Sequence, residues 1–428
     1  MPTELTDRHR RWRVNVFATT WMSYAGFYFC RKNFSIVKAP LKAVLEVTDY
    51  ELAHIWTAYL AAYMVGQFLS GWLGRKVACR RLLLGGMAVS LACNLVFGGL
   101  SLSGPGAYWP FLGLMVLNGF AQSTGWPGNI GVLAHWFRRR ERGTIIGVWA
   151  TCYQLGSVLA KSFAALMFGW LGLAWTFWGA SAVLLVVWAL FYFLQRDKPE
   201  DLGLAGIVEE VEVSDDDDTE ETVARESGRW SASVVRSVML MGASYFSFKF
   251  LRYGLDSWAP MFIEETFSAT TTVAGLVSTA FDWVGFTGVI VAGWVSDRFF
   301  AGRRATVAFA MAVGMVVAAG LLWGVGQTSI VLFGICLAFV GFTLFGPDSL
   351  LSGVGAIDVG SKRGAVVAAG IVNGMGSVGP IVQEELIGYL KTHHGMDAVF
   401  ILLIAVAMLG AIGTGVLWSW SRRGKSRF

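Results

Sequence analysis

Residues 71–76 read GWLGRK, and residues 293–298 read GWVSDR. Each hexapeptide closes a long apolar run and is followed by a short basic stretch. Two other landmarks recur at almost the same interval: Arg142-Gly143 with Arg363-Gly364, and Arg31 with Arg252. The three intervals are 222, 221 and 221 residues, so they agree within one residue. A repeat at a constant interval is typical of a duplicated unit, and the sequence therefore predicts two related halves.

The composition places these halves in a membrane. The chain has 428 residues, of which 55% are hydrophobic and only 15% charged, whereas a soluble domain carries about a quarter charged residues. Apolar runs of about 20 residues recur along the chain, and each can cross about 30 Å of hydrocarbon as a helix. The 52 glycines and 19 tryptophans agree with close helix packing and with anchoring at the membrane interfaces. We therefore expect an all-α membrane protein.

The charged residues between apolar runs divide the chain into twelve predicted spans. They cover residues 14–37, 52–73, 82–102, 108–136, 144–170, 172–194, 234–262, 270–296, 305–325, 328–350, 364–389 and 397–420. This division predicts a six-helix bundle over residues 1–195, an acidic cytoplasmic linker over 196–232 and a second six-helix bundle over 233–428. A run of like charges such as residues 214–221 repels itself and stays solvated, so we interpret the linker as a tether; a regulatory or metal-binding segment is the alternative.

Lysine and arginine are distributed unequally between the two sides of these spans. One side carries 21 of them, in residues 8–13, 75–81, 138–142, 298–304, 362–363 and 422–427. The other side carries three, which are Lys38, Lys42 and Lys391. By the positive-inside rule, both termini are expected in the cytoplasm, which requires an even number of spans. The first apolar segment lacks a cleavage site of small residues, so we expect it to be retained.

No metal, disulfide or catalytic centre is indicated. The five cysteines form no CxxC pair, and the five histidines are scattered. No combination of nucleophile and base typical of a hydrolase is visible, so an enzyme is not expected. We also expect no cofactor and no nucleic-acid partner, and we expect a monomer in the lipid bilayer.

Several charged residues lie inside the predicted spans, where each costs about 2.5–3.5 kcal/mol on insertion scales and is therefore a candidate functional residue. They are Arg31, Lys32, Lys161, Lys249, Arg252, Asp282, Asp348 and Glu384.

Arg31 shares one helical face with Tyr24 and Tyr28, at spacings of seven and three residues. A guanidinium beside two phenols suits an oxyanion; the alternative is that Arg31 reaches outward to the membrane surface. Lys32 points about 100° away from Arg31 around the helix axis. For Lys32 we therefore favour either extension of the side chain to the membrane surface or a structural ion pair.

Lys249, Arg252 and Asp256 fall on one face of the seventh span. Arg252 is the repeat counterpart of Arg31, and two arginines from matching helices can bind one phosphate from both sides through paired hydrogen bonds. The alternative for Arg252 is a structural pair with Asp282 or Asp348.

Lys161 lies deep in the fifth span, eight residues or about two helical turns beyond Tyr153. The repeat interval places it opposite residues near Glu384, so a structural Lys161–Glu384 pair is the alternative to a role in binding. Tyr63 and Gln67 lie one turn apart on the second span and could add uncharged hydrogen bonds; plain packing is the alternative for Tyr63.

Motifs along nearly the whole chain resemble a known family. The second hexapeptide, with Asp297, resembles the cytoplasmic loop signature G-x-x-S-D-R of the major facilitator superfamily, whereas the first departs from it at Gly74-Arg75. Within that superfamily, the chain resembles the organophosphate:phosphate antiporters. The matching segments are Arg31-Lys32-Asn33-Phe34-Ser35, Gly125-Trp126-Pro127, Pro199-Glu200-Asp201-Leu202-Gly203-Leu204, Leu251-Arg252-Tyr253-Gly254 with Trp258-Ala259-Pro260, and Phe345-Gly346-Pro347.

The resemblance implies the major facilitator fold of two pseudo-symmetric bundles. It also implies phosphate binding by Arg31 and Arg252, support from Tyr24, Tyr28 and Tyr63, and a gating or charge-pairing role for Asp282. Asp297, Asp348 and Glu384 are further candidates for gating or charge pairing. The departures are Gln67 for a lysine, Tyr153 for a histidine, and Phe345 and Ser377 for tyrosines. They predict that the part of the site around the organic group of the substrate has been rebuilt.

The resemblance thus implies exchange of an organophosphate, such as a sugar phosphate, for inorganic phosphate across a bacterial-type plasma membrane. Two alternatives stay open. The family contains a hexose-phosphate sensor, and Asp282 and Asp348 are compatible with proton-coupled uptake of a non-phosphorylated solute. The sequence does not identify the organic group.

Overall fold

In the computed structural model, residues 5–74, 76–138, 141, 145–146, 148–207, 232–300, 304–352 and 354–423 are described, except for the side chains of residues 232–233, 297 and 354–369. Most of the predicted linker, residues 208–231, therefore lies outside the described residues. The same is true of the side chain of Asp297.

The first half of the chain is a bundle of helices. Its described helices are α1 (Asp7–Ile36), α2 (Lys38–Leu45), α3 (Asp49–Leu73), α4 (Cys79–Leu100), α5 (Tyr108–Gln122), α6 (Gly125–Trp136), α8 (Thr151–Leu171) and α9 (Leu173–Leu194), with short 3-10 helices at Pro105–Ala107 and Pro199–Leu202. Thr6 caps α1 by accepting a hydrogen bond from the N–H of His9. Thr48 and Glu51 form a reciprocal capping box at the start of α3. Such caps satisfy backbone donors that a helix end leaves free, so they set where each helix begins.

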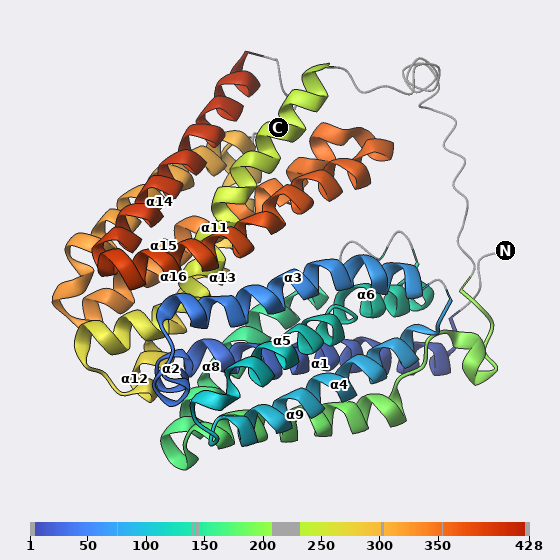
Figure 1. The fold of residues 1–428 in the computed structure, drawn as a ribbon. Coiled ribbons are helices and arrows are strands. Elements are labelled where there is room, and N and C mark those ends of the chain that lie inside the picture. Colours follow the sequence, from blue (N-terminus) through green and yellow to red (C-terminus); the bar gives the residue numbers. More distant parts are fainter. Residues whose placement is uncertain are drawn as a thin grey trace.

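The second half is a second bundle. Its helices are α11 (Ala232–Phe267), α12 (Thr271–Ser278), α13 (Ala280–Phe299), α14 (Arg304–Gly324), α15 (Ile330–Ser352) and α16 (Val354–Arg422), with a 3-10 helix at Gly326–Thr328. The 69 residues of α16 are too many for one crossing of a bilayer. The chain reverses near Gly395, whose φ of +81° suits a residue without a Cβ atom, and Figure 1 shows two arms on either side of this turn.

All twelve predicted spans coincide with helices. The described part of the chain contains eight helices that are long and apolar enough to cross a membrane, and one of them is the two-armed α16. The other predicted spans are α1, α3 and the pair α5–α6. Charged residues lower the hydropathy of α1, and a break at Ser123-Thr124 leaves α5 and α6 with 15 and 12 residues. The expectation of an all-α, twelve-span membrane protein is confirmed.

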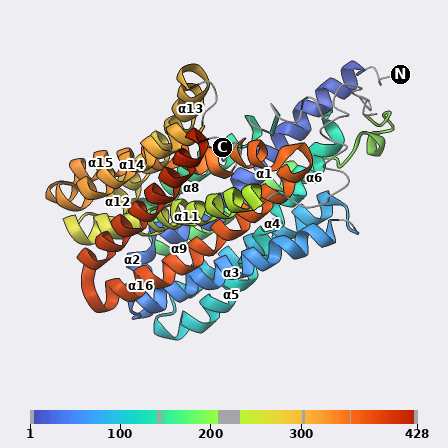
Figure 2. The ribbon, with the colours of Figure 1, turned by 90° about the horizontal axis from the view of Figure 1, so that it is seen from above.

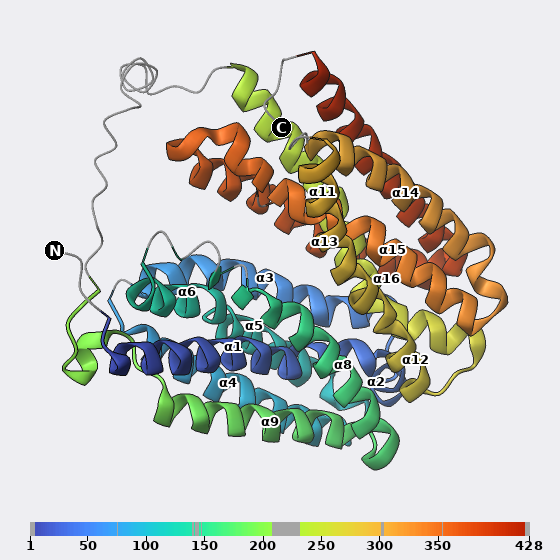
Figure 3. The ribbon, with the colours of Figure 1, turned by 180° about the vertical axis from the view of Figure 1, so that it is seen from behind.

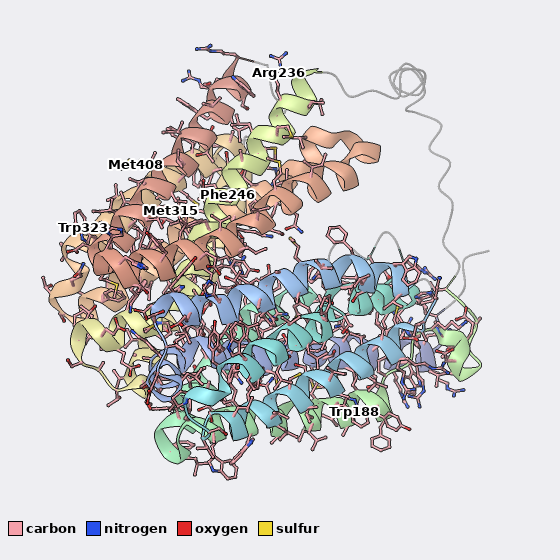
Figure 4. All side chains as sticks on the ribbon, in the orientation of Figure 1. Trp188, Arg236, Phe246, Met315, Trp323 and Met408 are labelled. Atoms are coloured by element: carbon pink, nitrogen blue, oxygen red, sulfur yellow. The ribbon has the colours of Figure 1, made fainter. Side chains whose placement is uncertain are left out.

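The outer surface of both bundles is apolar. Phe68, Phe193 and Ile412 are 77%, 69% and 63% exposed, as expected for side chains that face lipid. In Figure 4, Met408 lies at the outer edge of the second bundle, and 47% of its side-chain surface is exposed, whereas Met315 is fully buried between helices. The hydrocarbon of the bilayer would cover these outward residues.

The two bundles meet at one end. Figure 1 and the opposite view in Figure 3 show them close together near α2 and α12 and diverging toward the other end, where α1 begins and α16 ends. Figure 2 shows α16 running alongside α3. Their approach is close because Gly388 has no side chain: a Cβ atom there would lie 2.6 Å from the Cβ of Ala53. We call this shared boundary the seam; the sparsely charged connections with Lys38, Lys42 and Lys391 lie at its end.

Candidate functional site

A network of hydrogen bonds between uncharged polar groups in the first bundle orients the side chain that binds Arg31. Gln122 on α5 donates from Nε2 to the backbone oxygen of Cys30 at 3.0 Å and to the hydroxyl of Ser90 at 3.0 Å. Asn118 donates to the same oxygen of Cys30 at 3.2 Å. The hydroxyl of Tyr59 on α3 donates to Oε1 of Gln122 at 3.0 Å. Because its amide is held from several sides, Gln122 presents its oxygen in one fixed orientation.

Arg31 uses that oxygen and keeps part of its guanidinium free. Its Nε donates to Oε1 of Gln122 at 2.9 Å. The guanidinium carbon lies 5.0 Å from the ring centre of Tyr28, 4.7 Å from that of Tyr63 and 5.8 Å from that of Tyr59. Its Nη2 is buried and has no hydrogen-bond partner, and Arg31 forms no ion pair with the described residues. A buried cation among aromatic rings with a free donor is suited to receive an anion.

Arg252 differs from its repeat counterpart because it has an acidic partner. Its Nη1 donates to Oδ2 of Asp348 on α15 at 2.8 Å. The guanidinium also lies 4.5 Å from the ring centre of Phe345 and 5.9 Å from that of Tyr153. The sequence analysis left this pair open as an alternative to phosphate binding. In this conformation the carboxylate of Asp348 occupies one side of the guanidinium.

Tyrosine side chains bring the two arginines into one region. Tyr28 of α1 interacts electrostatically with both Arg31 and Arg252. Tyr253 of α11 likewise interacts with both arginines and with Tyr63 of α3. The two repeat-related arginines therefore face a common group of phenols at the boundary between the bundles.

Lys249 is held by neutral groups. Its Nζ donates to Oδ1 of Asn373 at 2.8 Å and to the hydroxyl of Ser377 at 3.0 Å, both on α16. It also lies 5.1 Å from the ring centre of Tyr245. Lys249 is only 9% exposed and forms no ion pair with the described residues. Like Arg31, Lys249 is therefore a buried cation without an acidic partner among the described residues.

Lys161 pairs with two aspartates and not with Glu384. Its Nζ lies 2.5 Å from Oδ1 of Asp256 and 2.7 Å from Oδ2 of Asp282. Lys32 also pairs with Asp256, so it does not reach outward to the membrane surface. Two lysines of the first bundle therefore meet two aspartates of the second bundle, and their charges balance. We call these four residues the deep charge cluster.

Glu384 pairs with Lys38 instead of Lys161. Both side chains are fully buried, and Lys38 also donates to the hydroxyl of Ser257 at 2.7 Å. The proposed Lys161–Glu384 pair is therefore wrong. The repeat interval aligned equivalent positions on equivalent helices, whereas pairing depends on which helices touch across the seam.

The remaining candidates contribute differently. Tyr24 is 6% exposed and packs against the rings of Tyr28, Trp126 and Trp149, at centroid distances of 5.8, 5.7 and 5.4 Å. Gln67 is half-buried and makes no hydrogen bond with the described residues. Within the same described residues, no group of three His, Cys, Asp or Glu side chains is placed as metal ligands would be.

Three residues that contribute to the site were not predicted from the sequence. Gln122 and Tyr59 orient Arg31, and Asn373 holds Lys249. A signal for Gln122 existed, because Asn118 and Gln122 are polar residues four apart in an apolar run and so share one helical face. Asn373 has no comparable signal in its own segment.

Comparisons with known proteins identify the family of this chain. A model of the Major Facilitator Superfamily matches residues 20–383. The chain belongs to this superfamily. It is accordingly a multi-pass membrane transporter and not an enzyme.

Curated relatives match over nearly the full length. The chain is 28% identical to the membrane sensor protein UhpC of Escherichia coli over 94% of this chain and 91% of that protein. It is 26% identical to the glycerol-3-phosphate transporter of Bacillus subtilis over 98% and 96% of the two chains. It is also 26% identical to a probable hexose phosphate transport protein of Chlamydia muridarum, over 99% and 94%. The resemblance to the organophosphate transporters is thereby confirmed.

Solved structures support the fold. The crystal structure of the D-xylose-proton symporter superposes with a TM-score of 0.71 over 94% of this chain and 97% of that chain, at 13% sequence identity. An inward-facing, unoccupied bacterial homologue of the lysosomal transporter Spinster gives a TM-score of 0.70 over 96% and 97%, also at 13% identity. At these identities the likeness concerns the fold alone.

Proposed function

We propose that this protein exchanges a phosphorylated small organic molecule for inorganic phosphate by alternating access. The observation that carries the proposal is the state of Arg31, a buried guanidinium whose Nη2 has no partner and which forms no ion pair with the described residues. A buried unpaired cation is costly. A bound phosphate would remove that cost and would accept paired hydrogen bonds from the planar guanidinium.

Arg252 would supply the second side of the phosphate site. It comes from the other bundle and faces the same phenols as Arg31. A ligand bound by both arginines would draw the bundles together, which is what coupling of binding to reorientation requires. The hydroxyls of Tyr28 and Tyr63 can donate further hydrogen bonds to phosphate oxygens.

The seam would be the gate on the side opposite the basic connections. In the present conformation the seam is closed by the deep charge cluster, by the Lys38–Glu384 pair and by Lys391, which contacts Asp49 at 2.9 Å. Reorientation would separate these partners and bring the opposite ends of the bundles together. The excess of Lys and Arg beside the other ends of the helices supports cytoplasmic termini in a bacterial-type plasma membrane.

The names of the relatives support an organophosphate as the substrate. Among them are a glycerol-3-phosphate transporter and a probable hexose phosphate transport protein. One relative is named a membrane sensor protein, so sensing of an organophosphate is the second candidate function. A sensor would bind the same anion but would transport little of it.

The test is phosphate exchange in proteoliposomes loaded with inorganic phosphate. We expect labelled phosphate to enter the wild-type vesicles and external glucose-6-phosphate or glycerol-3-phosphate to compete with it. Arg31→Lys and Arg252→Lys should each abolish exchange, because lysine keeps the charge but not the bidentate geometry. Arg196→Lys is the matched control, since Arg196 donates to the backbone oxygens of Phe193 and Gln195 at the C-terminal end of α9, away from the two site arginines.

Three results would count against the proposal. Exchange at the wild-type rate in both site variants would exclude the arginines as phosphate ligands. Binding of phosphate without exchange would favour the sensor. Uptake that needs a pH gradient but no internal phosphate would favour proton-coupled transport.

A further inference from the structure

Asp348 interacts electrostatically with two cations but forms an ion pair with one of them, Arg252, among the described residues. Its Oδ2 accepts the hydrogen bond from Arg252 at 2.8 Å, while its Oδ1 is buried and has no hydrogen-bond partner among the described residues. Lys249, one turn before Arg252 on α11, interacts electrostatically with the same carboxylate. Within the described part of the chain, Lys249 donates to the neutral groups of Asn373 and Ser377. A carboxylate with a free oxygen and a second cation nearby has two places to pair.

The other described side chains that interact with Asp348 carry no charge at neutral pH. The phenols of Tyr245 on α11 and Tyr153 on α8 both interact electrostatically with it. On its own helix, the hydroxyl of Ser352 donates to the backbone oxygen of Asp348 at 2.7 Å. The charge that Asp348 balances therefore belongs to Arg252 and Lys249.

The formal charges of the site can be counted from the residues described. Arg31, Arg252 and Lys249 contribute three positive charges, and Asp348 contributes one negative charge. The deep charge cluster beyond them is neutral, because it contains two lysines and two aspartates. The empty site thus carries a net charge of +2, which equals the charge of a phosphate monoester dianion in magnitude.

We propose that Asp348 is the counter-ion that sets the charge of the accepted substrate, and that it passes from Arg252 to Lys249 when phosphate binds. This inference rests on the proposed function. In the empty carrier, Asp348 neutralises Arg252. When a phosphate dianion engages Arg31 and Arg252, the carboxylate pairs with Lys249, and the occupied site is electrically neutral. Asp348 is therefore a positioning residue that acts through Arg252.

The proposal specifies the substrate class. A monoester whose organic part is uncharged, such as a sugar phosphate or a polyol phosphate, leaves no excess charge in the site. A phosphorylated carboxylic acid carries one more negative charge and would leave that charge uncompensated where burial makes it costly. We therefore expect the protein to select dianions over trianions.

The experiment measures inhibition of phosphate exchange at pH 7.5 by two compounds of similar size, glycerol-3-phosphate and 3-phosphoglycerate. The wild type should prefer glycerol-3-phosphate. Asp348→Asn raises the charge of the site to +3 and should shift the preference toward 3-phosphoglycerate by about tenfold or more. Adding Lys249→Gln to this variant returns the charge to +2 and should restore the wild-type preference. Ser349→Ala, a neutral change on the neighbouring residue of α15, should leave the preference unaltered.

A reciprocal variant keeps the test informative if Asp348→Asn does not reach the membrane. Lys249→Gln alone lowers the charge of the site to +1 and should favour monoanions. A monoester dianion takes up one proton near pH 6 and becomes a monoanion, so this variant should show tighter inhibition by glycerol-3-phosphate at pH 5.5 than at pH 7.5, relative to the wild type.

Two outcomes would overturn the inference while leaving the proposed function intact. The first is a folded Asp348→Asn protein that exchanges phosphate with an unchanged ratio of the two inhibition constants. The second is a double variant that keeps the shifted ratio. If the wild type exchanges no phosphate, the proposed function fails, and this inference fails with it.

Discussion

Replacement of Lys161 by methionine would remove the cation that joins two aspartates across the seam. The ammonium nitrogen lies 2.5 Å from Asp256 and 2.7 Å from Asp282. At an effective dielectric constant of about 20, a pair at this distance is worth roughly 6 kcal/mol of Coulomb energy. Desolvation opposes most of it, and loss of one partner from a buried pair costs about 3–5 kcal/mol because a charge is left unbalanced. Methionine fills a similar volume, so the loss measures charge and not packing.

The assay is thermal unfolding of the purified protein in detergent. We expect Lys161→Met to lower the midpoint on the order of 5 °C, since 1 kcal/mol moves the midpoint of a large protein by a degree or two. The double variant Lys161→Met with Asp282→Asn leaves Lys32 paired with Asp256 in a neutral arrangement and should recover part of the loss. Lys76→Met, at an exposed lysine outside the seam, is the control.

Two results would refute this reasoning. A midpoint for Lys161→Met equal to that of the control would show that the cation contributes nothing to the closed seam. A double variant less stable than either single variant would show that Asp282 has a role other than balancing Lys161.

Three further predictions concern exchange, the second buried pair and the cap of α3. Closing the empty carrier over an unpaired guanidinium should add about 4 kcal/mol to the barrier for reorientation. Efflux of labelled phosphate should therefore be about a thousandfold slower into phosphate-free buffer than into buffer with phosphate. Equal rates would exclude obligatory exchange. Lys38→Met or Glu384→Gln alone should destabilise the protein more than the two together, as thermal midpoints can show; an additive double variant would mean that the two do not pair. Hydrogen bonds from the N–H and hydroxyl of Thr48 lower the pKa of Glu51 below its ordinary 4.5. The stabilisation by Glu51 is therefore present above pH 4.5 and is lost as the pH falls through the lowered pKa; a difference in midpoint between wild type and Glu51→Gln that persists in acid would contradict this.

Much of the candidate site could be predicted from local patterns. The placement of Tyr28 beside Arg31 follows from helical spacing on α1, and the equivalence of Arg31 with Arg252 follows from the repeat interval. Both depend on residues within one helix or on a constant offset, which sequence displays directly. The pairing of Arg252 with Asp348 was one of two alternatives, because two acidic residues lay in plausible spans.

The partners of the buried lysines could not be predicted in this way. Lys161 contacts Asp282, 121 positions away, and Lys38 contacts Glu384, 346 positions away. Which of several buried carboxylates a lysine meets depends on how far each helix reaches and how the two bundles tilt against each other. No periodicity within either segment records that geometry.

That this chain is a membrane protein of two related helical halves follows from its sequence, because hydropathy, the distribution of basic residues and the repeat are properties of composition and spacing. The sequence also indicates that a few charges must lie inside the bilayer, where they require partners or a ligand. Which of these charges have an oppositely charged partner depends on how the helices pack. Carboxylates across the seam balance the charges of Lys32, Lys161 and Lys38. Among the described residues, the hydrogen-bond partners of Arg31 and Lys249 are all neutral. That division arises because ion pairing needs contact within a few ångströms, and contact between distant segments exists only once the helices have packed.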